Sequence, residues 1–283
     1  MLLELAVGDA YGAGFEYAPE LIGRCNDLSR YVQHPRHAIR PGWYTDDTQM
    51  SLAIAETIVA GHPWTPQVLA DAFVRAFKRD PREGYAGGFY TFLTQVRDGT
   101  EFLAQIRPDS DKSGAAMRAC PLGVFPTIAE VREKSTIQAK ITHDTPDGIA
   151  PAQAAALMAH YFLYDRGPKA TLGQFLDTYV PGYGWSEPWV GKVKSKGWMS
   201  VRAAVTAIIR NERISTLLRD CIAFSGDVDT VATIALGAAA GSREVEQDLP
   251  EHLIATLEQG PFGQAYLRAL DEQLLACLAR FRA

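Results

Sequence analysis

Two acidic clusters, each directly ahead of an apolar helical pattern, constrain the fold of this chain more than any other feature. The first lies in segment 44–50, YTDDTQM, where Asp46 and Asp47 are adjacent. From Met50 onward, apolar residues recur at the spacing of one helix face, at positions 50, 53, 54 and 58. The pattern predicts a helix over 50–60 with both carboxylates at its first turn, the end of a helix that favours negative charge.

The second cluster lies far along the chain, in segment 224–230, FSGDVDT, and another apolar run follows it at positions 231, 234, 235 and 238. Residues two apart lie on nearly opposite sides of a helix, so Asp227 and Asp229 converge only where the backbone is irregular. Gly226 permits such a turn. If the two helix starts meet in the fold, four carboxylates and three hydroxyls surround one small space, the hydroxyls being those of Thr45, Thr48 and Thr230.

Carboxylates crowded in this way favour a bound cation. Two unit charges about 4 Å apart repel by roughly 4 kcal/mol at an effective dielectric of about 20. Several such repulsions would remove much of the roughly 5–15 kcal/mol that stabilises a domain. An all-oxygen donor set suits Mg²⁺, Mn²⁺ or Ca²⁺ rather than zinc, and four carboxylates exceed what one Mg²⁺ usually takes from protein, which favours two metal ions. The alternative is that each cluster only caps its own helix.

The rest of the chain predicts further helices and no strands. Helical spacing begins at Pro66 and stops before Asp80-Pro81. It resumes over 92–103 and returns over 149–164, 201–209, 215–224 and 231–241. Residues 18–43 and 180–200 are predicted as loops, and His34 and His37 are expected in the exposed part of the first. No run of alternating strand residues stands between turns, so the prediction is an all-α fold in one domain, residues 1–283.

Composition excludes several classes of protein. The chain of 283 residues is 47% hydrophobic and 22% charged, which is ordinary for a soluble globular protein. A net charge of −5 argues against stable binding to nucleic acid or to an anionic membrane surface. No segment has the length and apolar character of a membrane helix or a secretory signal, so we expect a cytoplasmic protein. We also expect a monomer.

Five motifs, in this order, resemble those of the ADP-ribosylglycohydrolase family, which includes the hydrolase that reactivates ADP-ribosylated dinitrogenase reductase. Together they span most of the chain. The motifs are Gly8-Asp9 with Glu16 seven residues after Asp9, Thr45-Asp46-Asp47-Thr48, Ser113-Gly114-Ala115-Ala116-Met117-Arg118, Thr142-His143, and Gly226-Asp227-Val228-Asp229-Thr230.

The resemblance implies an all-α fold that holds two Mg²⁺ or Mn²⁺ ions and hydrolyses the bond between ADP-ribose and a protein side chain, with arginine the first candidate and serine the second. From the residues alone Glu16 is an ordinary surface glutamate, whereas the resemblance makes Glu16 and Asp46 the two candidates for the catalytic carboxylate. By the same resemblance the metal ligands are Thr45, Asp46, Asp47, Asp227, Asp229 and Thr230, and the ADP-ribose site is lined by Ser113, Gly114, Ala115 and His143.

Two other functions stay open at this stage. A two-metal site serves phosphoester or pyrophosphate hydrolysis equally well. A binding protein can also keep an ADP-ribose pocket without turnover, although the intact set of six metal ligands argues against it. The acceptor is not determined by the sequence either, because arginine, serine, a nucleic-acid end and small esters of ADP-ribose all remain candidates.

Overall fold

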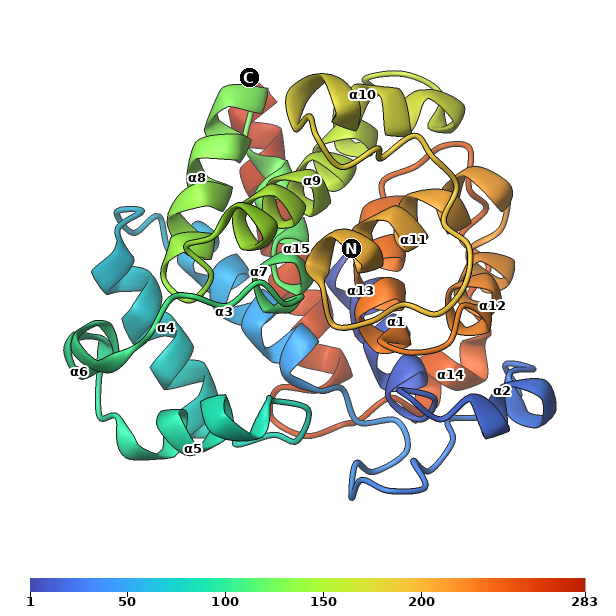
Figure 1. Cartoon of the computed structure of the whole chain (residues 1–283), viewed down its shortest axis with the longest axis horizontal. Helices are drawn as coiled ribbons and strands as arrows, with labels where there is room; N and C mark the ends of the chain where they lie inside the picture. Colours follow the sequence, from blue (N-terminus) through green and yellow to red (C-terminus); the bar gives the residue numbers. More distant parts are fainter. Residues whose placement is uncertain (283) are drawn as a thin grey trace.

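The computed structural model describes residues 1–282, and helices make up nearly all of its regular structure (Figure 1). No β-sheet forms within these residues, so the predicted all-α fold is confirmed. None of the helices in the described part of the chain combines the length and the apolar composition needed to cross a bilayer. The α-helices are α1 (Leu2–Ala13), α2 (Pro19–Cys25), α3 (Asp46–Val59), α4 (Pro66–Arg79), α5 (Gly87–Gln95), α6 (Gly99–Gln105), α7 (Gly114–Met117), α8 (Ile128–Lys140), α9 (Pro146–Leu163), α10 (Leu172–Tyr179), α11 (Gly197–Arg210), α12 (Ile214–Ala223), α13 (Val228–Ala239), α14 (Glu251–Thr256) and α15 (Gln264–Arg282), with short 3₁₀ helices at Cys120–Val124 and Lys169–Thr171.

Helices α1 and α13 form the centre of the molecule, and both are buried along almost their whole length. Their backbones lie close together because α1 carries glycine at two positions one turn apart. A Cβ atom added at Gly8 would lie 2.8 Å from the carbonyl oxygen of Ala232, and one added at Gly12 would lie 2.8 Å from the amide nitrogen of Asp229. The two glycines therefore set how near the first turn of α13 comes to the end of α1.

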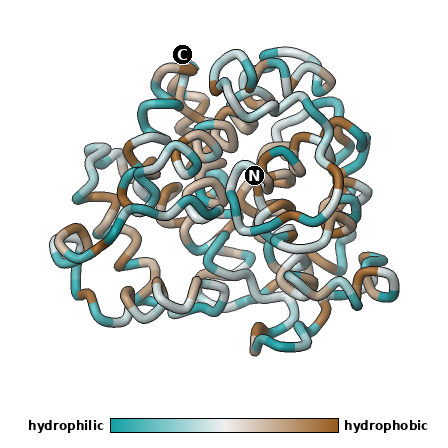
Figure 2. The backbone as a smooth tube through the Cα atoms, viewed as in Figure 1, coloured by the Kyte–Doolittle hydropathy of each residue, from teal (hydrophilic) through white to brown (hydrophobic). Residues whose placement is uncertain are grey.

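Helices α3, α9, α11, α12 and α15 pack directly against this pair. Helix α3 packs against α1, α4 and α15, while α9 packs against α8, α11 and α13 (Figure 1). Outer helices bury one face only: α4 buries Leu69, Phe73 and Phe77 and leaves Arg75 and Lys78 in solvent. The tube in Figure 2 accordingly alternates between hydrophobic and hydrophilic colours along such outer helices. This packing holds α3 and α13, and therefore their starts, in fixed positions.

Three local predictions need correction. Residues 18–43 are not all loop, because α2 begins at Pro19, whose fixed φ and missing N–H suit the first position of a helix. The run 92–103 is broken into α5 and α6, since the side chain of Asp98 accepts from the backbone of Glu101 and starts a new helix there. His34 is buried rather than exposed, whereas His37 is exposed as predicted.

The close packing of α1 on α13 predicts that Gly12→Ala destabilises the fold by about 1–3 kcal/mol, because the added methyl group overlaps the backbone of Asp229. Gly23→Ala in α2 is the matched control. Its Cβ would meet nothing within 4 Å, so stability should stay equal or rise. Urea unfolding of the two variants measures the difference, and equal unfolding midpoints would contradict this account of the glycine.

Candidate active site

Three chain segments that are distant in sequence meet at one cavity of about 550 Å³. The end of α1 leads to Glu16, the first turn of α3 brings Asp46 and Asp47, and the start of α13 brings Asp227 and Asp229. The two helix starts that the sequence separates by about 180 residues therefore do meet, and both acidic clusters lie at first turns. Five carboxylates line this single space.

The predicted site residues do not all reach the cavity. Glu16, Asp227 and Asp229 come closest together, each offering one oxygen within 4.8 Å of the other two. Asp46, Asp47, Thr230, Ser113, Gly114 and His143 line the same cavity. Thr45 and Ala115 are buried behind the lining.

Asp9 of α1 organises the start of α3. Its carboxylate accepts four hydrogen bonds, from the backbone N–H and the hydroxyl of Thr45 and from the same two groups of Thr48, at 2.6–2.9 Å. All four partners donate, so the Thr45 hydroxyl directs its hydrogen at Asp9 and keeps its lone pairs free to face elsewhere. The sequence singles out Asp9 only as part of a motif, and its structural role becomes visible only in the fold.

A strained turn aims the second cluster. Ser225 and Gly226 both adopt positive φ, at 62° and 93°, immediately before Asp227. The turn is pinned to Val193, whose amide donates to Ser225 O and whose carbonyl accepts from Asp227 N. A Cβ on Gly226 would collide with that Val193 carbonyl, so only glycine fits here. The irregular backbone expected from Gly226 is therefore present, and it lets Asp227 and Asp229 converge.

Two contacts hold the Glu16 segment beside this turn. The amide of Tyr17 donates to the carbonyl of Gly226 at 2.8 Å. His34 Nδ1 accepts from two backbone amides, those of Arg36 and His37, so its Nε2 carries the proton and donates to the carbonyl of Glu16 at 2.8 Å. His34 thus supports the position of Glu16 through the backbone, a role that its sequence context does not reveal.

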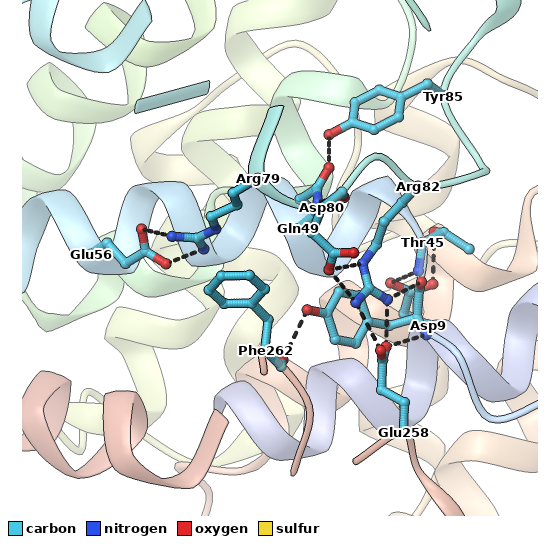
Figure 3. A network of polar contacts seen from close by, with 11 residues as sticks. Asp9, Thr45, Gln49, Glu56, Arg79, Asp80, Arg82, Tyr85, Glu258 and Phe262 are labelled. Atoms are coloured by element: carbon cyan, nitrogen blue, oxygen red, sulfur yellow. Dashed lines mark hydrogen bonds and ion pairs between the residues drawn. The ribbon is translucent and has the colours of Figure 1, made fainter. Parts of the chain in front are cut away.

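A buried ion pair supports the start of α3 from the opposite side (Figure 3). The guanidinium of Arg82 pairs with Glu258, and both side chains are at most 4% exposed. Arg82 also donates to the carbonyl of Tyr44 and lies over the Tyr44 ring, while the amide of Tyr44 donates to Glu258. Glu258 lies in the loop between α14 and α15, and Tyr44 directly precedes Thr45. The ion pair therefore connects this loop to the first acidic cluster.

Burial and mutual repulsion make it unfavourable for all five carboxyl groups of the cavity to be ionised together. Burial, together with the neighbouring carboxylates, raises the pKa of Asp46, Asp47 and Asp229 well above the usual range. Burial and the charge of Asp227 raise the pKa of Glu16 to about 7, and burial raises the pKa of Asp227 to about 6. If all five were ionised, these buried carboxylates would repel one another.

The residues present fit divalent cations. Two buried carboxylate oxygens, Asp47 Oδ1 and Asp229 Oδ1, have no hydrogen-bond partner within residues 1–282. A buried unpartnered anion is costly, and a cation is the simplest partner for it. Every candidate donor is a carboxylate or hydroxyl oxygen, which suits Mg²⁺ or Mn²⁺.

The remainder of the cavity has a different character. Phe89 and Phe92 of α5 lie nearly parallel, with ring centroids 5.9 Å apart, and line it together with Ile106. Its cationic lining residues are Arg107, Lys112 and Arg118. A ligand that fills this space would meet an acidic wall from α1, α3 and α13 and an aromatic and basic wall from the segment 86–118.

Comparison with known proteins identifies the family of the chain. The sequence model described as ADP-ribosylglycohydrolase matches residues 1–281, so the chain belongs to the ADP-ribosylglycohydrolase family, a family of hydrolases. A solved structure titled "ADP-ribosylglycohydrolase-related protein complex" has the same fold, with a TM-score of 0.69 at 23% identity over 99% of this chain and 95% of that one.

Three curated relatives are distant homologues, each identical to this chain at 23–26% of the aligned residues. The chain is 25% identical to ADP-ribosyl-[dinitrogen reductase] glycohydrolase of Rhodospirillum rubrum, over 90% of this chain and 88% of the relative. It is 23% identical to ADP-ribosylarginine hydrolase Tri1 of Pseudomonas putida, over 85% and 68%. It is 26% identical to ADP-ribosylhydrolase ARH3 of Xenopus tropicalis, over 62% of this chain and 53% of the relative, so the match spans about half of that protein.

The buried ion pair of Figure 3 predicts that Arg82→Met lowers the free energy of unfolding by about 3–5 kcal/mol, because Glu258 is left buried without its cationic partner. The double variant Arg82→Met/Glu258→Gln should recover part of the loss. Arg97→Met, which removes an exposed ion pair with Glu101, should leave stability essentially unchanged. Chemical unfolding compares the three, and a similar effect of Arg82→Met and Arg97→Met would reject the supporting role.

Proposed function

We propose that this protein is a metal-dependent hydrolase that cleaves the glycosidic bond between ADP-ribose and a protein side chain, with arginine the first candidate acceptor and serine the second. The observation that carries the proposal is the convergence of five carboxylates on one cavity whose other wall is aromatic and basic. Family membership supports the hydrolase chemistry, and the names of two relatives refer to ADP-ribosylarginine and to dinitrogen reductase.

In this proposal the metal ligands are Thr45, Asp46, Asp47, Asp227, Asp229 and Thr230, which hold two Mg²⁺ or Mn²⁺ ions. Thr45 lies behind the cavity lining. Its hydroxyl donates its hydrogen bond to Asp9, so the oxygen keeps a free lone pair. When bound, such ions bind sugar hydroxyls and lower the pKa of a water molecule. The unpartnered oxygens of Asp47 and Asp229 support the assignment.

The catalytic carboxylate is proposed to be Glu16, with Asp46 the second candidate. Hydrolysis of a glycosidic bond passes through an oxocarbenium-like transition state, in which a carboxylate takes a proton from the attacking water or gives one to the leaving group. Glu16 is only half-buried and lines the cavity, and its backbone is held by His34 and its neighbour Tyr17. It is therefore fixed in place while its side chain faces the open space.

The ADP part of the ligand is assigned to the other wall. Ser113, Gly114, Ala115 and His143 are proposed to hold the phosphates and the ribose, with Ala115 acting through the backbone because its side chain is buried. The cationic side chains of Lys112 and Arg118 line the same part of the cavity and favour an anionic ligand. Phe89 and Phe92 offer ring faces to the adenine.

The experiment that tests the function is the release of ADP-ribose from arginine-linked and serine-linked protein substrates, measured side by side with Mg²⁺ or Mn²⁺ and again with a chelator. Metal-dependent release from one substrate supports the proposal and identifies the acceptor. Cleavage of free ADP-ribose or of nucleotides without release from either substrate would favour the phosphoester or pyrophosphate hydrolase, and tight ADP-ribose binding without any turnover would favour a binding protein.

Removal of a proposed ligand should abolish activity while the fold remains. We expect Asp46→Ala and Asp229→Ala to reduce release of ADP-ribose below detection, because each variant removes a metal ligand. Both should keep the helical circular dichroism spectrum, because each relieves repulsion between carboxylates in the cavity. Mn²⁺ should raise the unfolding temperature of the wild type but not of the variants. Asp144→Ala, at an exposed carboxylate, is the control. Wild-type activity in either ligand variant with metal present would refute the assignment.

Asp9 is predicted to act on the metals through Thr45 and Thr48. Asp9→Asn places an amide N–H₂ among four donors, so the Thr45 hydroxyl loses its orientation. Affinity for Mn²⁺, measured by calorimetry, should fall about 10- to 100-fold, as for other residues that orient metal ligands. An affinity equal to that of the wild type would remove Asp9 from this role.

A further inference from the structure

A buried arginine stands beside the cavity without a carboxylate partner. Arg118 is 1% exposed, and its guanidinium lies over the ring of Phe73. No ion pair involves it within residues 1–282. Instead Arg118 Nε donates to Gln138 Oε1 at 2.6 Å, and Nη2 donates to the carbonyl of Gln138 and to Thr142 Oγ1, each at 2.9 Å. A charge buried at such cost on neutral acceptors calls for a reason beyond packing.

The direction of the hydrogen bonds beyond Arg118 follows from the donors and acceptors that are present. A guanidinium only donates, so the Thr142 hydroxyl must accept from Arg118. The hydroxyl has one hydrogen of its own, and its other partner is His143 Nδ1 at 2.7 Å. Within the described residues that hydrogen has no acceptor other than His143 Nδ1. Thr142 satisfies it only by donating to Nδ1, which is then unprotonated. In a neutral imidazole the proton then resides on Nε2.

The protonated nitrogen lies beside Gly114, which lines the cavity as His143 does. Nε2 has no hydrogen-bond partner within the described residues. A Cβ added at Gly114 would lie 3.2 Å from Nε2, so this atom lies against the segment assigned to the ADP-ribose phosphates and ribose. Burial and the charge of Arg118 lower the pKa of His143 to about 3, Lys112 acts in the same direction, and Asp111 opposes them. The ring is therefore neutral across the physiological range.

We propose that Arg118 and Thr142 are positioning residues that fix His143 in the Nε2–H tautomer, so that it always presents one hydrogen-bond donor to an acceptor oxygen of the ADP-ribose moiety. This inference rests on the proposed function for the identity of the ligand. It gives His143 a role in binding, as a neutral hydrogen-bond donor, rather than a role as a general acid or base. Through these hydrogen bonds the buried guanidinium of Arg118 determines which ring nitrogen of His143 donates to the ligand.

The tautomer can be measured without any ligand. Long-range ¹H–¹⁵N correlation spectra of protein labelled at histidine distinguish a protonated from an unprotonated ring nitrogen, and loss of one signal set in His143→Gln assigns the residue among the six histidines. We expect unprotonated Nδ1 and protonated Nε2 at every pH from about 5.5 to 8. A protonated Nδ1, or a cationic ring within this range, would overturn the inference.

A matched pair of variants tests the relay itself. Thr142→Val keeps the shape of the side chain but removes the hydroxyl, and Thr142→Ser restores it. The valine variant should lose the single tautomer and bind ADP-ribose about tenfold more weakly, as expected for one misdirected hydrogen bond. The serine variant should resemble the wild type in both respects. A single Nε2–H tautomer in Thr142→Val would contradict the role of Thr142, whatever the affinity.

The ligand-bound state separates this inference from the function on which it rests. Addition of ADP-ribose to the wild type should shift the Nε2–H signal of His143. If ADP-ribose binds and that signal does not move, only the inference about His143 is overturned. If the wild type binds no ADP-ribose and releases none from any substrate, the proposed function itself fails, and the tautomer measured without ligand still tests the positioning role of Arg118 and Thr142.

Discussion

The concentration of negative charge between α1, α3 and α13 is the constraint on which the rest of the structure depends. Five carboxylates line one cavity, and buried oxygens of Asp47 and Asp229 lack partners in the described part of the chain. Such an arrangement reduces the stability of the fold unless cations fill it, so the surrounding helices must hold it in place. The two glycines of α1 and the left-handed turn before Asp227 use backbone geometry that larger side chains do not permit, and both serve this convergence.

Several charged groups that support the site can either only donate or only accept hydrogen bonds. Asp9 can only accept, so it orients the hydroxyls of Thr45 and Thr48. Arg82 can only donate, so it connects Glu258 to the chain just before Thr45 (Figure 3). Arg118 can only donate as well, and through Thr142 it determines the polarity of His143. Buried charges thus set the direction of neighbouring neutral hydrogen bonds, and the two walls of the cavity are organised by the same principle.

Much of the fold and part of the candidate site could be predicted from the sequence, because both are encoded locally. Apolar spacing indicates the helices, and residues before the apolar runs of α3 and α13 locate the acidic first turns. The helix α2 was missed because its first residue is a proline within a stretch of turn residues, and none of its side chains is buried. His34, Arg82 and Glu258 could not be found, since each acts on a segment distant in sequence and only the tertiary structure brings them together. Thr45 and Ala115 resemble lining residues by motif, yet burial places both behind the surface of the cavity.

The most direct test of the central claim is a crystal structure grown with Mn²⁺ and ADP-ribose, with anomalous scattering used to locate the manganese. We expect two manganese peaks among Asp46, Asp47, Asp227 and Asp229, with the ribose beside them and the phosphates near Gly114. An active protein whose crystals contain ADP-ribose but no manganese between α3 and α13 would contradict that claim.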